Sequence, residues 1–349
     1  MARMSLLAAL FLGMCLPSLA RAERRASPPS APHQPAQRAA ERAIAYLQTE
    51  SAAWLNQRHC AACHHVAMPL WALAEAGREG YATDQKFAAS TAEATLGSLE
   101  KMQASGIATN PAAPPDPRPL AKGVNEGAVF MAVAAESLPA LNDGQKQSLA
   151  RIEAQILQKQ RDDGSWDFYL SRPPINESKE SDTAWMLMAL QGDPSPNGAD
   201  ARRAAETKGL AWLTAQPGRP DDPQLKSLKL LLAIRAGTPR DTLQTEIDAL
   251  LALQRSDGGW AQTAHGPTDA FATGQALYVL SLAGRTPSRP EIRRAIDFLV
   301  ATQKPDGSWP MTSRATPDGR PGSAKLLTPI TSAATAWSTL ALTHLAPER

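Results

Sequence analysis

Gln254-Arg-Ser-Asp-Gly-Gly-Trp260 is one of three nearly identical heptapeptides in this sequence. The other two are Gln160-Arg-Asp-Asp-Gly-Ser-Trp166 and Gln303-Lys-Pro-Asp-Gly-Ser-Trp309. All three fit Q-[KR]-x-D-G-[SG]-W, and three copies of so specific a pattern indicate an internal repeat. Each copy follows an apolar-periodic stretch and precedes a polar loop and a second apolar stretch. The repeating unit is therefore helix, glycine-containing turn, loop, helix.

The spacing of the copies predicts further, degenerate units. The first two motif tryptophans lie 94 positions apart and the last two 49, so one unit is hidden between the first two. Residues 45–54 keep the interval of six from Gln to Trp, whereas residues 99–106 and 213–218 keep only Gln and Gly. The anchoring glutamines are then Gln48, Gln103, Gln160, Gln216, Gln254 and Gln303. We expect six helix pairs in an all-α domain.

The second helix of each pair is expected to be the inner one. Residues 184–190 and 270–280 are apolar nearly all round, which is typical of helices buried on every face. Several such stretches end at a glycine suited to a left-handed C-terminal cap, namely Gly77, Gly192, Gly237 and Gly284. Amphipathic outer helices around this inner ring form an α6-α6 barrel, which we assign to residues 37–346.

The repeated motif resembles the QW repeat of squalene-hopene and oxidosqualene cyclases, whose superfamily includes the protein prenyltransferases. The resemblance spans about residues 36 to 346 and is strongest from Leu157 onward. It implies an α/α toroid in which the Gln and Trp side chains tie one outer helix to the next. The implied structural clamps are Gln160 with Trp166, Gln254 with Trp260, and Gln303 with Trp309.

The N-terminus predicts export. Residues 1–22 contain a basic start at Arg3, an apolar run from Leu6 to Leu16 and a small-x-small end at residues 20–22, as in a secretory signal peptide. A lipoprotein signal at Cys15 fits less well, because Met14 stands where a small residue is needed. Residues 23–36 are rich in Pro, Ser and Ala and predict a flexible linker.

Charge and hydropathy argue against nucleic-acid binding and against a membrane-spanning helix. Removing residues 1–22 deletes two of the 36 basic residues and no acid, which leaves 34 basic against 34 acidic residues. A balanced chain without a basic cluster argues against a nucleic-acid partner. No later apolar run reaches the roughly 18 residues of a membrane-spanning helix, so we expect no transmembrane segment in the mature chain.

Residues 60–64 read Cys-Ala-Ala-Cys-His, the C-x-x-C-H attachment sequence of a c-type haem. The two thiols would add to the haem vinyl groups, and His64 would bind the iron as its proximal ligand. Cys60 and Cys63 are the only thiols left after loss of the signal peptide, and export agrees with haem c, which is attached after translocation in bacteria. The sequence therefore predicts covalent haem c directly before the first inner helix.

Other interpretations of this motif stay open. Cys60 and Cys63 could form a redox-active or purely structural disulfide, and with His64 and His65 they could hold zinc. The distal haem ligand is not identified, and Met68 is too close in sequence to reach across the iron. His59 and His65 are expected to be neighbours of the haem or ordinary surface residues. The candidates for the distal ligand are Met102, Met131, Met186, Met188 and His265.

The residues expected for cyclase or transferase chemistry are incomplete. Class II cyclases of the resembled family protonate their substrate with an aspartate of a D-x-D-D motif, and the matching residues 179–182 read Lys-Glu-Ser-Asp. The proton donor's position holds Ser181, and a hydroxyl is too weak an acid to protonate an alkene. Prenyltransferases need a zinc-binding Cys in the barrel, and none follows Cys63. Weak catalytic candidates are Asp182, Asp269 and Glu180, the two aspartates being expected first as N-caps.

Three functions follow as hypotheses. The first is a periplasmic or secreted haem c protein on a toroid scaffold, which transfers electrons to a periplasmic redox partner or oxidises a bound substrate. The second is a non-catalytic toroid that binds an apolar, lipid-like ligand or a protein and carries a structural disulfide. The third is a diverged terpene cyclase, whose cavity would be lined by Trp185, Phe271, Tyr278 and Trp337.

Overall fold

The computed structural model describes residues 33–58, 63–105, 125–138, 140–168, 172–192, 198–219, 221–314 and 329–347, apart from the side chains of residues 58, 63 and 98–105. The predicted signal peptide, residues 1–22, lies outside this part of the chain, as does most of the predicted linker. Residues 33–36 of that linker are instead the first turn of helix α1. The helical domain therefore starts before residue 37.

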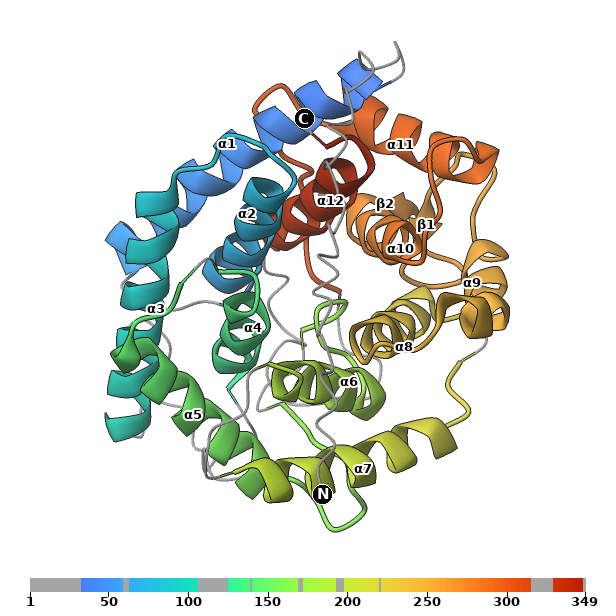
Figure 1. Ribbon diagram of the computed structural model, residues 1–349. Coiled ribbons are helices and arrows are strands. Elements are labelled where there is room, and N and C mark those ends of the chain that lie inside the picture. Colours follow the sequence, from blue (N-terminus) through green and yellow to red (C-terminus); the bar gives the residue numbers. More distant parts are fainter. Residues whose placement is uncertain are drawn as a thin grey trace, which may run out of the picture.

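Twelve α-helices in the described residues form two concentric rings, which confirms the predicted all-α, α6-α6 toroid (Figure 1). The outer ring consists of α1 (His33–Arg58), α3 (Gln85–Ser105), α5 (Asp143–Gln158), α7 (Ala199–Ala215), α9 (Gln244–Leu251) and α11 (Pro290–Thr302). The inner ring consists of α2 (Met68–Arg78), α4 (Glu126–Ala135), α6 (Lys179–Leu190), α8 (Pro223–Arg235), α10 (Ala270–Leu282) and α12 (Thr331–Leu345).

Short elements complete the described chain. A π-helical turn, η1 (Cys63–Ala67), leads directly into α2, and a 3₁₀ turn, η3 (Arg240–Leu243), leads into α9. Strands β1 (Trp260–Ala261) and β2 (Thr268–Asp269) pair antiparallel, with Trp260 opposite Asp269. Among the described residues, no helix combines the length and the apolar character that crossing a bilayer requires.

Burial separates the two rings as the hydrophobic pattern predicts. In the outer helix α11 the buried side chains are Ile292, Ala295, Ile296 and Leu299, which lie on one face at helical spacing. In the inner helix α10 every residue from Ala270 to Ser281 is buried. Helices like α10 are stable only when covered on all sides, so the outer ring is a condition for the inner one.

The three complete motifs form one repeated set of hydrogen bonds at the ends of outer helices. In the first, the Gln160 side-chain amide donates to the Gly164 carbonyl (3.0 Å) and to the Ala205 carbonyl of α7, the next outer helix (2.9 Å). Gln254 bonds Gly258 and Glu291 of α11 in the same way, and Gln303 bonds Gly307 and Ala39 of α1. Each glutamine thus joins its own turn to the following outer helix.

The motif tryptophans join each outer helix to the inner helix of its own unit. The indole N–H groups of Trp166, Trp260 and Trp309 donate to the carbonyls of Ile156, Leu250 and Leu299, at 2.7, 2.9 and 3.0 Å. Their backbone N–H groups donate to the hydroxyls of Thr183, Thr273 and Thr335 at the starts of α6, α10 and α12. The rings are fully buried, so the indoles act as packed plates with a satisfied donor.

The degenerate units keep only part of this arrangement. The Gln48 side chain accepts the backbone N–H of Asp84, directly before α3, and so still touches the next outer helix. The Gln216 side chain donates to the Trp212 carbonyl of its own helix, α7, and its backbone carbonyl accepts from Lys229 of α8. Trp54 lies within α1 and stacks on His65, with ring centroids 3.6 Å apart. The side chain of Gln103 lies outside the described residues.

The ring is closed by contacts between the two ends of the chain. Gln303 after α11 bonds Ala39 of α1, and Arg42 of α1 donates to the Gln303 side-chain oxygen. At the inner ring, the Tyr81 hydroxyl after α2 donates to the carbonyl of Ala346 after α12. α1 therefore stands to α11 as α7 stands to α5, and the repeat leaves no open edge.

Glycine is required where each clamp turn meets the next outer helix. Gly164, Gly258 and Gly307 have φ values of +97, +93 and +91°, which L side chains rarely adopt. A Cβ atom at Gly307 would also lie 2.2 Å from the Arg42 carbonyl oxygen. Of the four predicted capping glycines, Gly237 and Gly284 have positive φ, but Gly77 and Gly192 do not, and Gly80 holds that conformation after α2. The cap predictions at Gly77 and Gly192 are therefore wrong.

Three glycine-to-alanine variants separate the free-energy cost of a positive φ from the cost of a steric clash with the next outer helix. Gly97→Ala, inside α3 with open space around it, should leave stability unchanged or raise it by up to about 1 kcal/mol. Gly237→Ala, with φ +77° but no close neighbour, should cost about 1 kcal/mol. Gly307→Ala should cost more than about 2 kcal/mol because backbone strain and the clash with α1 add. Denaturant unfolding would measure this, and equal costs at Gly237 and Gly307 would contradict the close contact at ring closure.

Candidate functional site

The starts of the inner helices are joined to one another at one end of the barrel, here called the mouth. His64 before α2 contacts Arg172, which also pairs with Glu126, the first residue of α4. Glu177 before α6 pairs with Arg219, which precedes α8. Arg314 bonds Gln262, which donates to Asp269 at the start of α10, and Ser332 of α12 contacts His65. The mouth is thus a continuous polar layer over an apolar inner ring.

His64 lies in this layer and not on the open surface. It is in η1, with 5% of the residue exposed. Its Nδ1 atom is 3.4 Å from an Arg172 guanidinium nitrogen. Burial lowers the pKa of His64 well below its ordinary value, with further lowering by His65 and Arg172, whereas a hydrogen bond to the Pro329 backbone opposes this. The environment of His64 therefore favours the neutral form of its imidazole.

Its neighbour His65 is held as a structural residue. Trp54 stacks on the His65 ring at an interplanar angle of 7°, and Ser51 donates to the His65 carbonyl at 2.9 Å. The two imidazoles themselves lie 4.2 Å apart, centroid to centroid. The first half of the motif, including Cys60, and the Cys63 side chain lie outside the described residues. Between the residues that are described, no group of three or more His, Cys, Asp or Glu could hold a metal ion.

The distal-ligand candidates are spread over the barrel. Met131, Met186 and Met188 are fully buried in the hydrophobic core, on α4 and α6. His265 is exposed in the turn between β1 and β2. The side chain of Met102 is outside the described part. Nothing in these positions singles out one of them as a partner of His64.

Residues 172–177 close the mouth, and sequence analysis did not predict their role. The Arg172 guanidinium lies 3.7 Å from a Glu126 carboxylate oxygen, and the Asn176 amide donates to the other oxygen at 3.1 Å. Trp185 of α6 donates from its indole nitrogen to the Ile175 carbonyl, and the Arg314 backbone N–H donates to Pro173. Contacts between residues so far apart in sequence leave no periodic signal, so only the fold reveals them.

The start of α6 differs from the sequence-based expectation. Ser178 is the N-cap, and it forms a reciprocal capping pair with Ser181. Asp182 is the fourth residue of the helix, only 1% exposed, and its carboxylate accepts the Phe168 backbone N–H at 3.1 Å. The N-cap prediction is therefore wrong for Asp182. Thr183 and Thr273 occupy equivalent positions, because each accepts the backbone N–H of a motif tryptophan. Asp182, one residue earlier, therefore corresponds to Ala272 and not to Asp269.

Asp269 is the N-cap of α10, as predicted. Its carboxylate accepts the Ala272 backbone N–H at 2.9 Å and the Gln262 amide at 3.0 Å. Burial raises the pKa of Asp269 from 3.8 to about 6, although its hydrogen bonds act in the opposite direction. Asp269 thus combines a raised pKa with a place in the polar layer.

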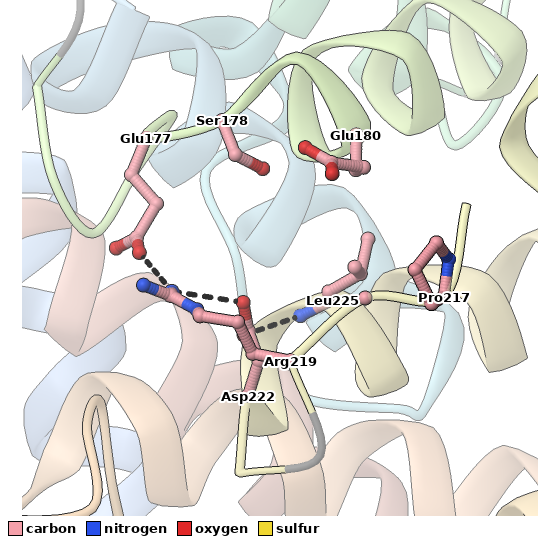
Figure 2. A pocket seen from close by; sticks show the side chains of 8 residues that line it. Glu177, Ser178, Glu180, Pro217, Arg219, Asp222 and Leu225 are labelled. Carbon is pink, nitrogen blue, oxygen red and sulfur yellow. Dashed lines mark hydrogen bonds and ion pairs between the residues drawn. The ribbon is translucent and has the colours of Figure 1, made fainter. Parts of the chain in front are cut away.

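Glu180, the third candidate, lines an open pocket of about 360 Å³ beside the mouth (Figure 2). Figure 2 shows the Arg219 guanidinium between the carboxylates of Glu177 and Asp222, with Ser178, Pro217 and Leu225 on the other walls. Arg314 pairs with the second oxygen of Glu177. The charges that face this pocket are therefore largely paired with one another.

Aromatic side chains from the inner helices meet at the barrel axis. Trp337 of α12 contacts Trp71 of α2, Phe271 and Tyr278 of α10, and Trp185 of α6, with ring centroids 5.2 to 6.4 Å apart. α6 and α12 are on opposite sides of the inner ring, so this contact spans the axis (Figure 1). Phe130 of α4 packs against Trp185 at 4.6 Å. The aromatic residues expected to line a cavity pack against one another instead.

Comparisons with known proteins agree with this architecture. Residues 225–348 match the family model of the squalene-hopene cyclase C-terminal domain. No curated protein matches the sequence significantly. The match and the double ring of helices define a squalene-cyclase-like α/α toroid.

Solved structures resemble nearly the whole chain. A protein from Actinoplanes is 18% identical, with a TM-score of 0.55 over 89% of this chain and 99% of its own. The type II terpene cyclase MstE from Scytonema is 15% identical, with a TM-score of 0.56 over 90% and 99%. A variant of that cyclase has been solved with its substrate geranylgeranyl dihydroxybenzoate and gives a TM-score of 0.52 at 16% identity, over 90% and 99%. At these identities the likeness shows a shared fold, the α/α toroid.

The raised pKa of Asp269 predicts a pH dependence of stability. The folded state binds this proton more tightly than the unfolded chain, so protonation favours folding. Its stabilising contribution is complete below about pH 4 and is lost as pH rises through about 6, by at most about 3 kcal/mol. Asp269→Asn keeps a capping side chain and should remove this loss. Urea unfolding of both proteins between pH 4 and 7 would measure it, and parallel pH profiles would contradict the assignment.

Proposed function

We propose that this protein is an exported toroid that carries one covalently attached c-type haem and transfers electrons, and that it does not cyclise terpenes. The observation that supports it most directly is the state of His64. This residue completes the C-x-x-C-H motif and is buried at the barrel mouth, where burial lowers the pKa of its imidazole. A haem iron would be bound by the neutral form of this imidazole.

In this proposal the C-x-x-C-H motif holds the haem at the mouth. His64 would bind the iron, and Cys60 and Cys63 would hold the porphyrin through thioether bonds. Once bound, the haem supplies a one-electron redox centre. The polar layer around His64, with Arg172 and Glu126 beside it, holds the imidazole in place and limits access of water to it. Transfer to a periplasmic redox partner would take place at this end of the toroid.

Two features of the inner ring argue against cyclisation. Ser181 occupies the acid position and is used in the capping pair with Ser178, while the Asp182 carboxylate is bound to the Phe168 backbone. The axis that would hold a polyprene chain is occupied by Trp337 and its aromatic neighbours. Type II terpene cyclases of this fold bind lipid-like substrates, and a similar ligand here would need these side chains to move.

The second candidate is a non-catalytic toroid in which Cys60 and Cys63 form a disulfide. The aromatic contacts across the barrel axis favour this second candidate over an enzyme that needs a cavity. It would bind an apolar or lipid-like ligand or a protein partner on a surface outside the axis. A zinc site formed by Cys60, Cys63, His64 and His65 is the corresponding metal alternative.

A visible spectrum tests the haem proposal. The chain should be produced with its own N-terminus in a host that attaches haem c, and compared with a Cys60→Ala, Cys63→Ala variant. We expect a reduced α band that survives acid-acetone extraction in the wild type and is absent in the variant. His64→Gln should change the spectrum because it removes the side chain that would bind the iron, whereas His344→Gln, in the last turn of α12 and away from the mouth, should not. A colourless wild-type protein would overturn the proposal and leave the disulfide-bearing toroid.

A cyclase assay tests the other half of the proposal. Incubation of the purified protein with squalene, followed by product analysis, should give no cyclised product, because Ser181 cannot protonate an alkene. Introducing a carboxylic acid with Ser181→Asp should not create cyclase activity, because the aromatic side chains still meet at the axis. Cyclised products from the wild-type chain would show that another acid, with Glu180 and Asp269 as the first residues to replace, performs this step.

A further inference from the structure

The clamp bonds give the inner helices a common register. Thr183, Thr273 and Thr335 are equivalent because each accepts the backbone N–H of a motif tryptophan. Two residues further along, α6 has Trp185 and α12 has Trp337, both on the barrel axis. The equivalent residue of α10 is Gln275. An amide therefore replaces an axial indole in one unit of three.

Gln275 and Trp337 each carry a buried donor. Gln275 is 1% exposed and Trp337 is not exposed at all. Within the described part of the chain, neither the Gln275 Nε2 atom nor the Trp337 Nε1 atom has a hydrogen-bond partner. Trp185, the other axial indole, donates to the Ile175 carbonyl at 3.2 Å. The two buried donors without an acceptor therefore lie on α10 and α12, whereas the indole donor on α6 has one.

The two donors belong to one small region. Phe271 and Tyr278, one turn before and after Gln275 on α10, both contact the Trp337 ring, at 6.4 and 6.1 Å between centroids. Gln275 thus lies on the face of α10 that meets Trp337. The backbones are also close at this level, since a Cβ atom at Gly274 would be 2.6 Å from the Ser338 nitrogen. Gln275 and Trp337 therefore belong to facing stretches of α10 and α12.

A buried donor without an acceptor is destabilising, and two in one region point to a shared acceptor. The rings around them supply no strong acceptor, and a charged one would be costly in such an apolar setting. We propose that the barrel axis binds one uncharged oxygen acceptor, which accepts from Gln275 Nε2 and Trp337 Nε1 together. Its source is either a trapped water or the hydroxyl or carbonyl oxygen of a small organic molecule. This site does not depend on the haem.

The direction in which Gln275→Met changes Tm tests whether a shared acceptor is bound. Gln275→Met keeps the side-chain length and removes the donor. If the acceptor is bound, the variant should lower Tm by a few degrees, and by less in a Trp337→Phe background because the second donor is already gone. A Trp185→Phe background is the matched control, since Trp185 has its own carbonyl partner and should leave the effect of Gln275→Met unchanged. A rise in Tm, with additive effects in both backgrounds, would overturn the proposal.

Direct detection on the wild-type chain separates the two sources and does not rely on any variant folding. Oxygen-17 relaxation dispersion should count one more long-lived internal water in the wild type than in Gln275→Met if water is bound. Mass spectrometry of an organic extract of the denatured protein should find a stoichiometric alcohol or carbonyl compound if a small molecule is bound. Finding neither would overturn the site, whatever the visible spectrum shows about haem.

Discussion

The structure depends on one glutamine amide that donates two hydrogen bonds at once. In each complete unit the side-chain nitrogen bonds the carbonyl of its own glycine turn and a carbonyl of the next outer helix. A primary amide has two donors, which is why one side chain can join two helices. The contact needs a backbone without a Cβ atom at the turn, since the neighbouring helix passes within 2.6 Å of that position even in the least crowded copy. Repeated between α11 and α1, the same bond closes the ring.

Ring closure determines where polar groups can be placed. All inner helices begin at the mouth, where exposed backbone donors can be capped and charges can pair, as Glu126 does with Arg172 and Glu177 with two arginines. Away from the mouth the inner helices pack against other helices, and most of their buried side chains are apolar. Asp269 lies between the polar mouth and the apolar interior. Burial there disfavours its charged form and raises its pKa, even though the carboxylate caps a helix.

Aromatic rings from five of the six inner helices meet at the barrel axis. At the start of α6, Ser181 stands where the resemblance expects an acid, and it forms a capping pair with Ser178. The proposed haem site at the mouth and the proposed acceptor site on the axis lie in different zones of the barrel. Each can therefore be tested without reference to the other.

The sequence by itself determined the architecture, because the repeated Gln, Gly and Trp and the all-round apolar inner helices leave a closed double ring as the way to bury them. It also identified the C-x-x-C-H motif and the absence of a cyclase acid at Ser181, since both depend only on neighbouring residues. The structure alone decided that Ser178, not Asp182, caps α6, because two polar side chains within one turn compete for the same cap. The tertiary structure alone decided that residues 172–177 cover the mouth and that Trp337 meets Trp185 at the axis. These last two features arise from contacts between segments far apart in the chain, and such contacts leave no periodic pattern in the sequence.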